Sequence, residues 1–331
     1  MSWPIVLLTL LEIPLVAWGT QLFARMLRAG QYIRPEGPVA HAAKAGTPTM
    51  AGIVPLSALT LAVLLAWALG IHSTSRAWFA LAAAWLAGGI GLLDDLLSQR
   101  RRTSLGLAPV HKLLLGAGAA ALLFALVPLL PDVEVLVPFS PFKFPLAALP
   151  PWALFLLLLT AFWGTTNAVN LTDGLDGLAP GAVLIVLLGL LPLVWGQEDL
   201  AGLSLLSAGA LVGFLWVNAY PAGAFLGDVG SMGLGGLLFG IAFSGGMVFL
   251  LPILGGLFVI EALSVILQVT SFKLTGKRLL KMSPLHHHLE AGDVPWPHLL
   301  PGANWPEPKV VVRLWILCGA CVLLGVLAKA I

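Results

Sequence analysis

Residues 178–195 read LAPGAVLIVLLGLLPLVW and contain no charged side chain. A helix needs about 20 apolar residues to cross the hydrocarbon core of a bilayer, so this stretch is typical of a membrane-spanning helix. Its apolar residues are continuous and do not alternate with polar ones, which favours a helix over a strand of a membrane barrel. Residues 178–195 therefore predict a chain that is embedded in lipid.

The same pattern recurs on both sides of this stretch. We predict ten spans at residues 3–27, 50–70, 77–97, 111–130, 151–168, 178–195, 201–219, 232–250, 252–272 and 310–330. The ninth begins at Pro252 and contains Gly255 and Gly256, which favours a bent helix. The expected fold is an all-α polytopic bundle, a single membrane domain over residues 1–331, with a polar loop at 274–309.

Composition excludes several classes of protein. Of 331 residues, 59% are hydrophobic and 10% are charged, whereas soluble domains carry about 25% charged residues. An ordinary soluble enzyme, a disordered chain and a nucleic-acid binder that relies on a basic patch are therefore excluded. Cys318 and Cys321 lie in an apolar run and predict packing residues. No basic segment precedes the first apolar stretch, so we expect no cleaved signal peptide.

The basic residues are distributed unevenly between the two predicted faces. Ten spans place both termini on one side, and only Arg76, Lys143 and Lys329 fall on that side, against fourteen Lys and Arg on the other. Basic loops face the cytoplasm, so both termini are expected outside it. Among the external connections, residues 132–146 alternate around Ser140-Pro141, which predicts a small β-hairpin, with an irregular loop as the alternative.

Five aspartates fall at the predicted cytoplasmic ends of the spans. They are Asp94, Asp95, Asp173, Asp176 and Asp228. Ionisable groups at membrane depth need a partner or a function, and Mg²⁺, which takes one or two carboxylates plus substrate phosphates, would relieve their mutual repulsion. The alternative is that each carboxylate is interfacial and solvated.

The residues around Asp173, Asp176 and Asp228 indicate how these carboxylates could form a binding site. Residues 167–177 read NAVNLTDGLDG, and the spacing of three between Asn170, Asp173 and Asp176 predicts one polar face if the segment is helical. The glycines of this segment leave room for a ligand. Asp228 lies among glycines in a turn just before a span, where it is able to point into a cleft.

Two runs of adjacent polar residues, the Asp94–Asp95 pair and the three histidines at 286–288, are limited in what they can bind together. Asp94 and Asp95 are adjacent and point about 100° apart on a helix, so they are expected to have different partners. His286, His287 and His288 are contiguous and cannot easily face one metal ion. We expect these imidazoles to bind a diphosphate or nucleotide, or to order a loop.

Nine stretches together resemble the phospho-N-acetylmuramoyl-pentapeptide-transferase (MraY) family, within the polyprenyl-phosphate hexosamine-1-phosphate transferases. They are residues 44–52, 91–95, 106–112, 167–177, 214–222, 225–231, 261–273, 283–290 and 305–308. The resemblance implies ten spans with both termini outside. It implies transfer of phospho-MurNAc-pentapeptide from UDP to undecaprenyl phosphate at the cytoplasmic face of the bacterial inner membrane. Lipid I and UMP are the products, and Mg²⁺ is the cofactor.

The resemblance also implies residue roles. The catalytic positions are Asp94, Asp95, Asp228 and His287; Asp94 would face the lipid phosphate as general base, and Asp228 would bind Mg²⁺, with Asp173 as a second candidate ligand. The substrate-binding positions are Lys44, Thr49, Lys112, Asn170, Asp173, Asp176, Asn218, Phe225, Gln268, His286 and His288. Phe225 is similar to an aromatic that stacks on uracil. A homodimer is one option for the assembly.

The sequence departs from the family pattern twice. The family often has Lys where this chain has Ser98, and Arg100 to Arg102 are candidates to supply that charge. Residues 291–304 form an insert between Glu290 and Trp305.

Two other functions stay open at this point. They are a GlcNAc-1-phosphate transferase acting on the same lipid and, from another class, a membrane transporter, which would place acids near the midplane in inverted repeats. Direct attack and a route through an aspartyl-phosphate are both compatible with the sequence.

Overall fold

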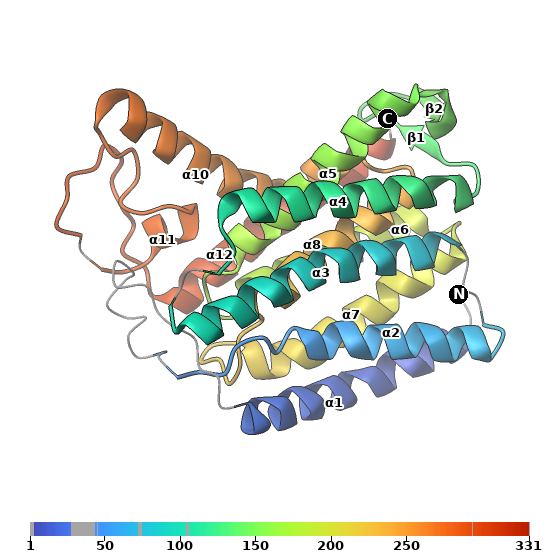
Figure 1. Cartoon of the computed structure of the whole chain (residues 1–331), viewed down its shortest axis with the longest axis horizontal. Coiled ribbons are helices and arrows are strands. Elements are labelled where there is room, and N and C mark those ends of the chain that lie inside the picture. Colours follow the sequence, from blue (N-terminus) through green and yellow to red (C-terminus); the bar gives the residue numbers. More distant parts are fainter. Residues whose placement is uncertain are drawn as a thin grey trace.

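The computed structural model describes residues 3–27, 44, 46–71, 75–103, 106–292 and 294–330. Within them, eight helices are long and apolar enough to cross a membrane, and two apolar helices are shorter (Figure 1). The eight are α1 (Trp3–Met26), α3 (Ser75–Arg101), α4 (Pro109–Leu126), α5 (Pro151–Thr172), α7 (Glu198–Asn218), α8 (Gly227–Ser244), α10 (Gly256–Thr275) and α12 (Glu307–Ala330); the shorter two are α2 (Ile53–Ala68) and α6 (Leu178–Val194). The expected all-α fold is confirmed, and the eight long apolar helices are consistent with a polytopic membrane protein. The number of ten spans and their orientation stay predictions.

Every predicted span overlaps helical residues of the structure, with two informative differences. Helix α8 begins at Gly227, five residues earlier than the predicted start at residue 232, so Asp228 lies in its first turn. The ninth span is divided into the short helix α9 (Leu251–Leu254) and α10, with the break at Gly255. Beyond this break α10 runs out to one side of the bundle (Figure 1).

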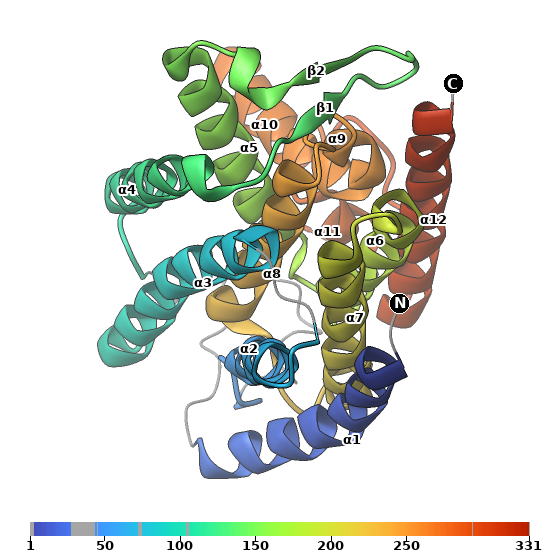
Figure 2. The ribbon, with the colours of Figure 1, turned by 90° about the vertical axis from the view of Figure 1, so that its right-hand side faces the viewer.

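Helix α8 forms the centre of the bundle and packs mainly on α3 and α5 (Figure 2). Small residues allow this close packing. A Cβ on Gly236 would lie 2.4 Å from the carbonyl oxygen of Ala83, and one on Gly240 would lie 2.4 Å from the Cα of Ala80. Helices in membranes associate through such small-residue contacts, so the position of α8 along α3 is fixed by backbone contact.

The predicted hairpin is present. Strands β1 (Glu134–Leu136) and β2 (Lys143–Pro145) pair antiparallel, with Val135 opposite Phe144. Its amide groups also bind the bundle, since Leu136 N donates to Gly246 O and Phe139 N donates to Ala328 O near the end of α12. The hairpin therefore lies at the same end of the molecule as the last turn of α12 and the first turn of α1 (Figure 1).

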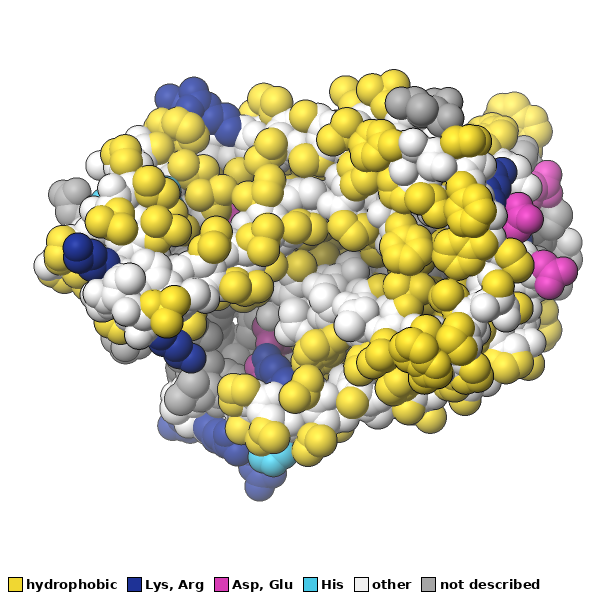
Figure 3. All heavy atoms as spheres, turned by 90° about the horizontal axis from the view of Figure 1, so that it is seen from above, with side chains coloured by type: hydrophobic (Ala, Val, Ile, Leu, Met, Phe, Trp, Pro, Cys, Tyr) yellow, Lys and Arg dark blue, Asp and Glu magenta, His cyan; other side chains and the backbone are white. Residues whose placement is uncertain are grey.

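The surface has an apolar belt between two polar ends (Figure 3). Side chains such as Leu122 and Trp216 are 59% and 79% exposed, which a water-soluble protein rarely tolerates over so large an area. Most basic side chains visible in this view lie at the end that carries α10 and the short helix α11 (Leu285–Leu289), and acidic ones show at the opposite end. Arg28 and Arg34, both part of the predicted basic face, lie outside the described residues.

Candidate functional site

Asp94 on α3 and Asp228 on α8 are joined by one cation. The Nζ atom of Lys112, from α4, lies 3.1 Å from Asp94 Oδ1 and 3.1 Å from Asp228 Oδ2. Asp94 also accepts a hydrogen bond from the amide of Leu107 at 2.7 Å. The structure thus brings together three residues that the sequence placed in separate motifs.

Asp95 points to a different partner, as expected for its position beside Asp94. Its Oδ2 accepts a 2.9 Å hydrogen bond from the amide of Val229 in the first turn of α8. Carboxylates are favourable at this end of a helix, where backbone N–H groups are unpaired. Gly227, with φ +72°, begins the turn, and a Cβ there would lie 2.9 Å from Asp95 Oδ2. Asp95 therefore anchors the turn that presents Asp228.

Asn170, near the end of α5, completes the contacts of Asp228. Its amide Nδ2 donates to Asp228 Oδ1 and to Ser231 Oγ, both at 2.9 Å. Ser231 was not among the predicted site residues. Because it lies about one helical turn after Asp228 on α8, it could have been predicted to face the same site.

The expectation of one helical face through Asn170, Asp173 and Asp176 is wrong for the two aspartates. Helix α5 ends at Thr172, and residues 173–177 form a turn that closes at Gly177, with φ +78°. A left-handed backbone favours glycine. Burial raises the pKa of the Asp173 carboxyl well above its usual range, and the charges of Asp228 and Asp95 raise it further. Asp173 is therefore part of the same electrostatic cluster.

Asp176 belongs to a second, adjacent cluster. Lys44 Nζ lies 2.7 Å from Asp176 Oδ1 and 2.5 Å from Glu307 Oε1, at the start of α12. Burial alone lowers the pKa of Lys44, but hydrogen bonds and charges from the two carboxylates raise it above its ordinary value. Glu307 lies in the stretch 305–308 that resembles the family, but it was not among the predicted site residues. Its place just before an apolar span could have indicated a role there.

The three histidines point to three different partners. His286 Nδ1 lies 3.2 Å from Glu261 Oε2, and His287 Nδ1 lies 3.2 Å from Glu290 Oε2. His288 Nδ1 accepts a hydrogen bond from the amide of Lys281. His287 is half-buried, whereas the other two are buried.

Four other predicted residues lie around this site. Asn218 and Gln268 use their side-chain amides on the backbone: Asn218 accepts from Gly177 N and donates to Ala224 O, and Gln268 pairs with both the N–H and the C=O of Leu280. The segment with buried Thr49 runs beside half-buried Phe225, whose N donates to Pro48 O. These contacts order the loops that carry the charged residues.

Among the described residues, no group of three or more His, Cys, Asp or Glu side chains is arranged as a metal cluster. The chemistry of the donor set nevertheless fits Mg²⁺, because Asp94 and Asp228 present carboxylate oxygens that both lie 3.1 Å from one lysine nitrogen, and Asp173 offers a further carboxylate beside them. Mg²⁺ usually takes only one or two protein carboxylates and completes its shell with water and phosphate.

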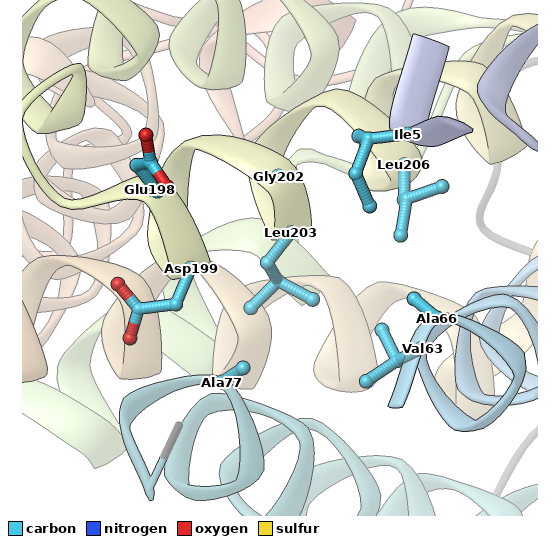
Figure 4. A pocket seen from close by; sticks show the side chains of 9 residues that line it. All are labelled: Ile5, Val63, Ala66, Ala77, Glu198, Asp199, Gly202, Leu203 and Leu206. Carbon is cyan, nitrogen blue, oxygen red and sulfur yellow. The ribbon is translucent and has the colours of Figure 1, made fainter. Parts of the chain in front are cut away.

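A small cavity lies elsewhere, beside the first turn of α7. Its volume is about 10 Å³, room for roughly one water molecule. Figure 4 shows the carboxylates of Glu198 and Asp199 on one side of it and apolar side chains such as Ile5 and Leu206 on the other. It is too small for an organic substrate.

Comparison with known proteins identifies relatives over most of the chain. A family model described as glycosyl transferase family 4 matches residues 77–246. The phospho-N-acetylmuramoyl-pentapeptide-transferase of Cutibacterium acnes (strain DSM 16379 / KPA171202) is 41% identical over 341 residues, which cover 93% of this chain and 92% of that protein. The matched region 77–246 contains Asp94, Asp95, Lys112, Asn170 and Asp228.

Proposed function

Because the chain belongs to the phospho-N-acetylmuramoyl-pentapeptide-transferase family, we propose that it transfers phospho-MurNAc-pentapeptide from UDP-MurNAc-pentapeptide to undecaprenyl phosphate. The products are lipid I and UMP, a step of peptidoglycan biosynthesis. The observation that carries the assignment of the site is the convergence of Asp94 and Asp228 on Lys112, with Asn170 bound to Asp228. Asp173 lies close enough for the charge of Asp228 to raise its pKa, after the larger effect of burial. These charges suit a reaction between two phosphate groups.

The reaction exchanges one P–O bond for another. An oxygen of the lipid phosphate attacks the β-phosphorus of the nucleotide sugar, and the bond between that phosphorus and the UMP oxygen breaks. Phosphoryl transfer depends mainly on positioning and charge neutralisation. A phosphate monoester has a second pKa of about 6 and is already largely ionised near neutral pH. Asp94, held by Leu107 N and Lys112, therefore orients the nucleophile more than it removes a proton.

Asp228 is the proposed Mg²⁺ ligand, and Asp173 is the second candidate. When bound, Mg²⁺ would supply charge neutralisation at the diphosphate. Lys112, which lies between Asp94 and Asp228, is the proposed protein cation for a phosphate oxygen. Lys44 and His287 are further candidates for phosphate contact, and Phe225 for contact with uracil. His286 and His288 are buried, so their proposed role is to order the loop around the substrate.

The lipid substrate reaches the site from the apolar belt. Helix α10 leaves the bundle after Gly255, and Leu263, Ile266 and Leu267 face outward from it. Figure 3 shows a hollow between apolar side chains, with charged side chains at its edge. A phosphate at the head of a polyprenyl chain would thus meet a water-soluble nucleotide at the membrane boundary. The cytoplasmic position of this end in the bacterial inner membrane is part of the proposal.

The test is UMP release by purified protein supplied with UDP-MurNAc-pentapeptide, undecaprenyl phosphate and Mg²⁺. We expect release to require all three and to be lost in Asp228→Asn. Asp132→Asn is the matched control, because Asp132 is an exposed aspartate outside the site, and it should remain active. Unchanged release by Asp228→Asn would contradict the assigned metal ligand, and turnover of UDP-GlcNAc alone would assign the chain to the sister activity.

The stereochemical course of the transfer and the oligomeric state of the protein are tested separately. A chiral thiophosphate at the transferred phosphorus should be inverted by direct attack, and net retention would instead indicate an aspartyl-phosphate route. The homodimer stays a prediction, which the mass of the purified protein in detergent tests.

A further inference from the structure

Glu261 on α10 is a carboxylic acid with no contact to solvent: its side chain is 0% exposed. Such groups are costly within a membrane-spanning helix and usually have a partner or a function. Its Oε2 lies 3.2 Å from His286 Nδ1 and accepts a 3.3 Å hydrogen bond from His286 N. The mechanism proposed above gives Glu261 no role.

The other side of the His286 ring is directed at the turn that carries two of the site aspartates. A Cβ on Gly174 would lie 2.1 Å from His286 Nε2, so the imidazole fills the space that this glycine leaves between Asp173 and Asp176. Neither ring nitrogen of His286 has a hydrogen-bond partner among the described residues. The hydrogen bond from His286 N to Glu261 therefore fixes the residue, and its ring lies between the Glu261 carboxyl on one edge and the backbone of the site turn on the other.

Helix α10 is attached to the histidine loop at two points on one face. Glu261 contacts His286, and Gln268, seven residues later, pairs with the backbone of Leu280. Residues seven apart lie two turns apart on the same side of a helix. Both are buried. These hydrogen bonds fix the position of the histidine loop relative to α10.

We infer that Glu261 is a positioning residue: by orienting the His286 imidazole against Gly174, it sets the place of the 173–177 turn beside Asp228. This inference rests on the role proposed above for the aspartates. Glu261 itself touches no reacting group. Its effect passes through His286, and that dependence can be measured.

Glu261→Gln keeps the size of the side chain and removes its charge. Because misplacement of reacting groups by about 1 Å can cost about 100-fold, we expect kcat to fall by about 10- to 100-fold with KM changed less than about twofold. Glu12→Gln is the matched control. Glu12 is also a buried carboxylate in a long apolar helix, α1, and no hydrogen-bond partner of its carboxylate lies among the described residues. It should keep turnover within about twofold of the parent.

A double-mutant cycle separates positioning from general destabilisation. If Glu261 acts through His286, Glu261→Gln should cost nothing further in a His286→Gln protein, whereas independent structural effects would multiply. Multiplied losses, or a Glu261→Gln enzyme as fast as the parent, would overturn the inference. Neither result would bear on Asp228, whose own variant tests the proposed function.

A second variant approaches the same ring from the opposite side, should Glu261→Gln fail to fold. Gly174→Ala places a methyl group where Nε2 now lies, and we expect a similar loss of kcat. The loss should disappear in a His286→Ala background, because the methyl group then meets no ring. An equal loss in both backgrounds would show that Gly174 is needed for reasons unrelated to His286 and would contradict the inference.

Discussion

A Cβ atom built on Gly91 would lie 2.1 Å from the carbonyl oxygen of Asp228. The backbones of α3 and α8 therefore touch at the residue proposed to bind the metal. Three residues along the chain from Gly91, Asp94 contacts the same Lys112 as Asp228 does. One backbone contact thus sets the separation of the two carboxylates.

Gly91→Ala should damage the site by pushing α8 away from α3. Overpacking of this kind costs about 1–3 kcal/mol of stability, and displacement of Asp228 should reduce turnover by up to about 100-fold. Both effects are measured on purified protein, by thermal unfolding and by UMP release.

Gly89→Ala is the control on the same helix, because nothing lies within 4 Å of a Cβ at that position. Alanine is favoured over glycine in a helix by about 1 kcal/mol, so this variant should be active and no less stable. Equal behaviour of the two variants would refute the close-packing argument.

Lys44 should matter for stability as well as for substrate. Lys44→Met leaves Asp176 and Glu307 as buried, unpaired carboxylates, and removal of one partner from a buried ion pair costs about 3–5 kcal/mol. Lys44→Arg keeps the charge and should lose less. In a Lys44→Met protein, Glu307→Gln should restore part of the loss, measured as the midpoint of thermal unfolding; a further drop would contradict mutual charge compensation.

The sequence predicts the apolar framework well, because burial in lipid leaves a continuous signal. The ten apolar segments and the hairpin near residues 132–146 follow from local patterns. The placement of Asp94, Asp173 and Asp228 at one face follows from the order of the predicted spans. The helix boundaries at the site do not. The spacing of three from Asn170 to Asp176 would give one polar face if the segment were helical, but α5 ends at Thr172 and glycines at 174 and 177 allow a turn there instead.

Contacts between side chains that are far apart in the sequence could not be predicted from local patterns. Gln268 stays a predicted substrate-binding residue, and its amide also pairs with the N–H and the C=O of Leu280, a contact that the sequence did not indicate. Glu261 and Glu307 lie inside quoted motifs, but only the fold reveals that they meet His286 and Lys44. Charge pairs between separate helices leave no periodic trace in the sequence.

The histidine loop should lose stability in mild acid because of His288. Burial lowers the pKa of His288, and the charges of His298 and Lys281 lower it further. Since His288 is neutral when it accepts the hydrogen bond of Lys281 N, the unfolded loop binds a proton more readily than the folded one. Stability is then full above the ordinary pKa of about 6.5 and declines as pH falls below that value towards the folded pKa.

Hydrogen exchange of the Lys281 amide between pH 5 and 8, corrected for intrinsic rates, measures this effect. His288→Asn keeps an acceptor that does not titrate and should remove the dependence. The comparison is made in a His298→Gln background, because His298 lies 6.2 Å from His288 between ring centroids and its charge contributes to the lowered pKa of His288. If hydrogen exchange depends on pH in the same way with and without His288→Asn, a group other than His288 causes the dependence.

The insert at residues 291–304 should act as a brace for the segment that leads to the histidines. Trp296 Nε1 donates to Lys281 O at 2.9 Å, and its ring lies 4.4 Å from the guanidinium of Arg278. The amide of Leu299 also donates to Arg278 O. The insert thus folds back on residues 278–281, through which α10 connects to α11.

Trp296→Ala removes both side-chain contacts. A cation–π contact contributes about 0.5–1 kcal/mol and a hydrogen bond about 0.5–1.5 kcal/mol, so local opening should become roughly 5- to 70-fold more frequent. Trypsin cleavage after Arg278 reports this opening when reclosing is fast. Trp296→Phe keeps an aromatic face without the N–H donor and should fall between the parent and Trp296→Ala. Cleavage of Trp296→Ala at the parental rate would mean that the insert lies on the loop without stabilising it.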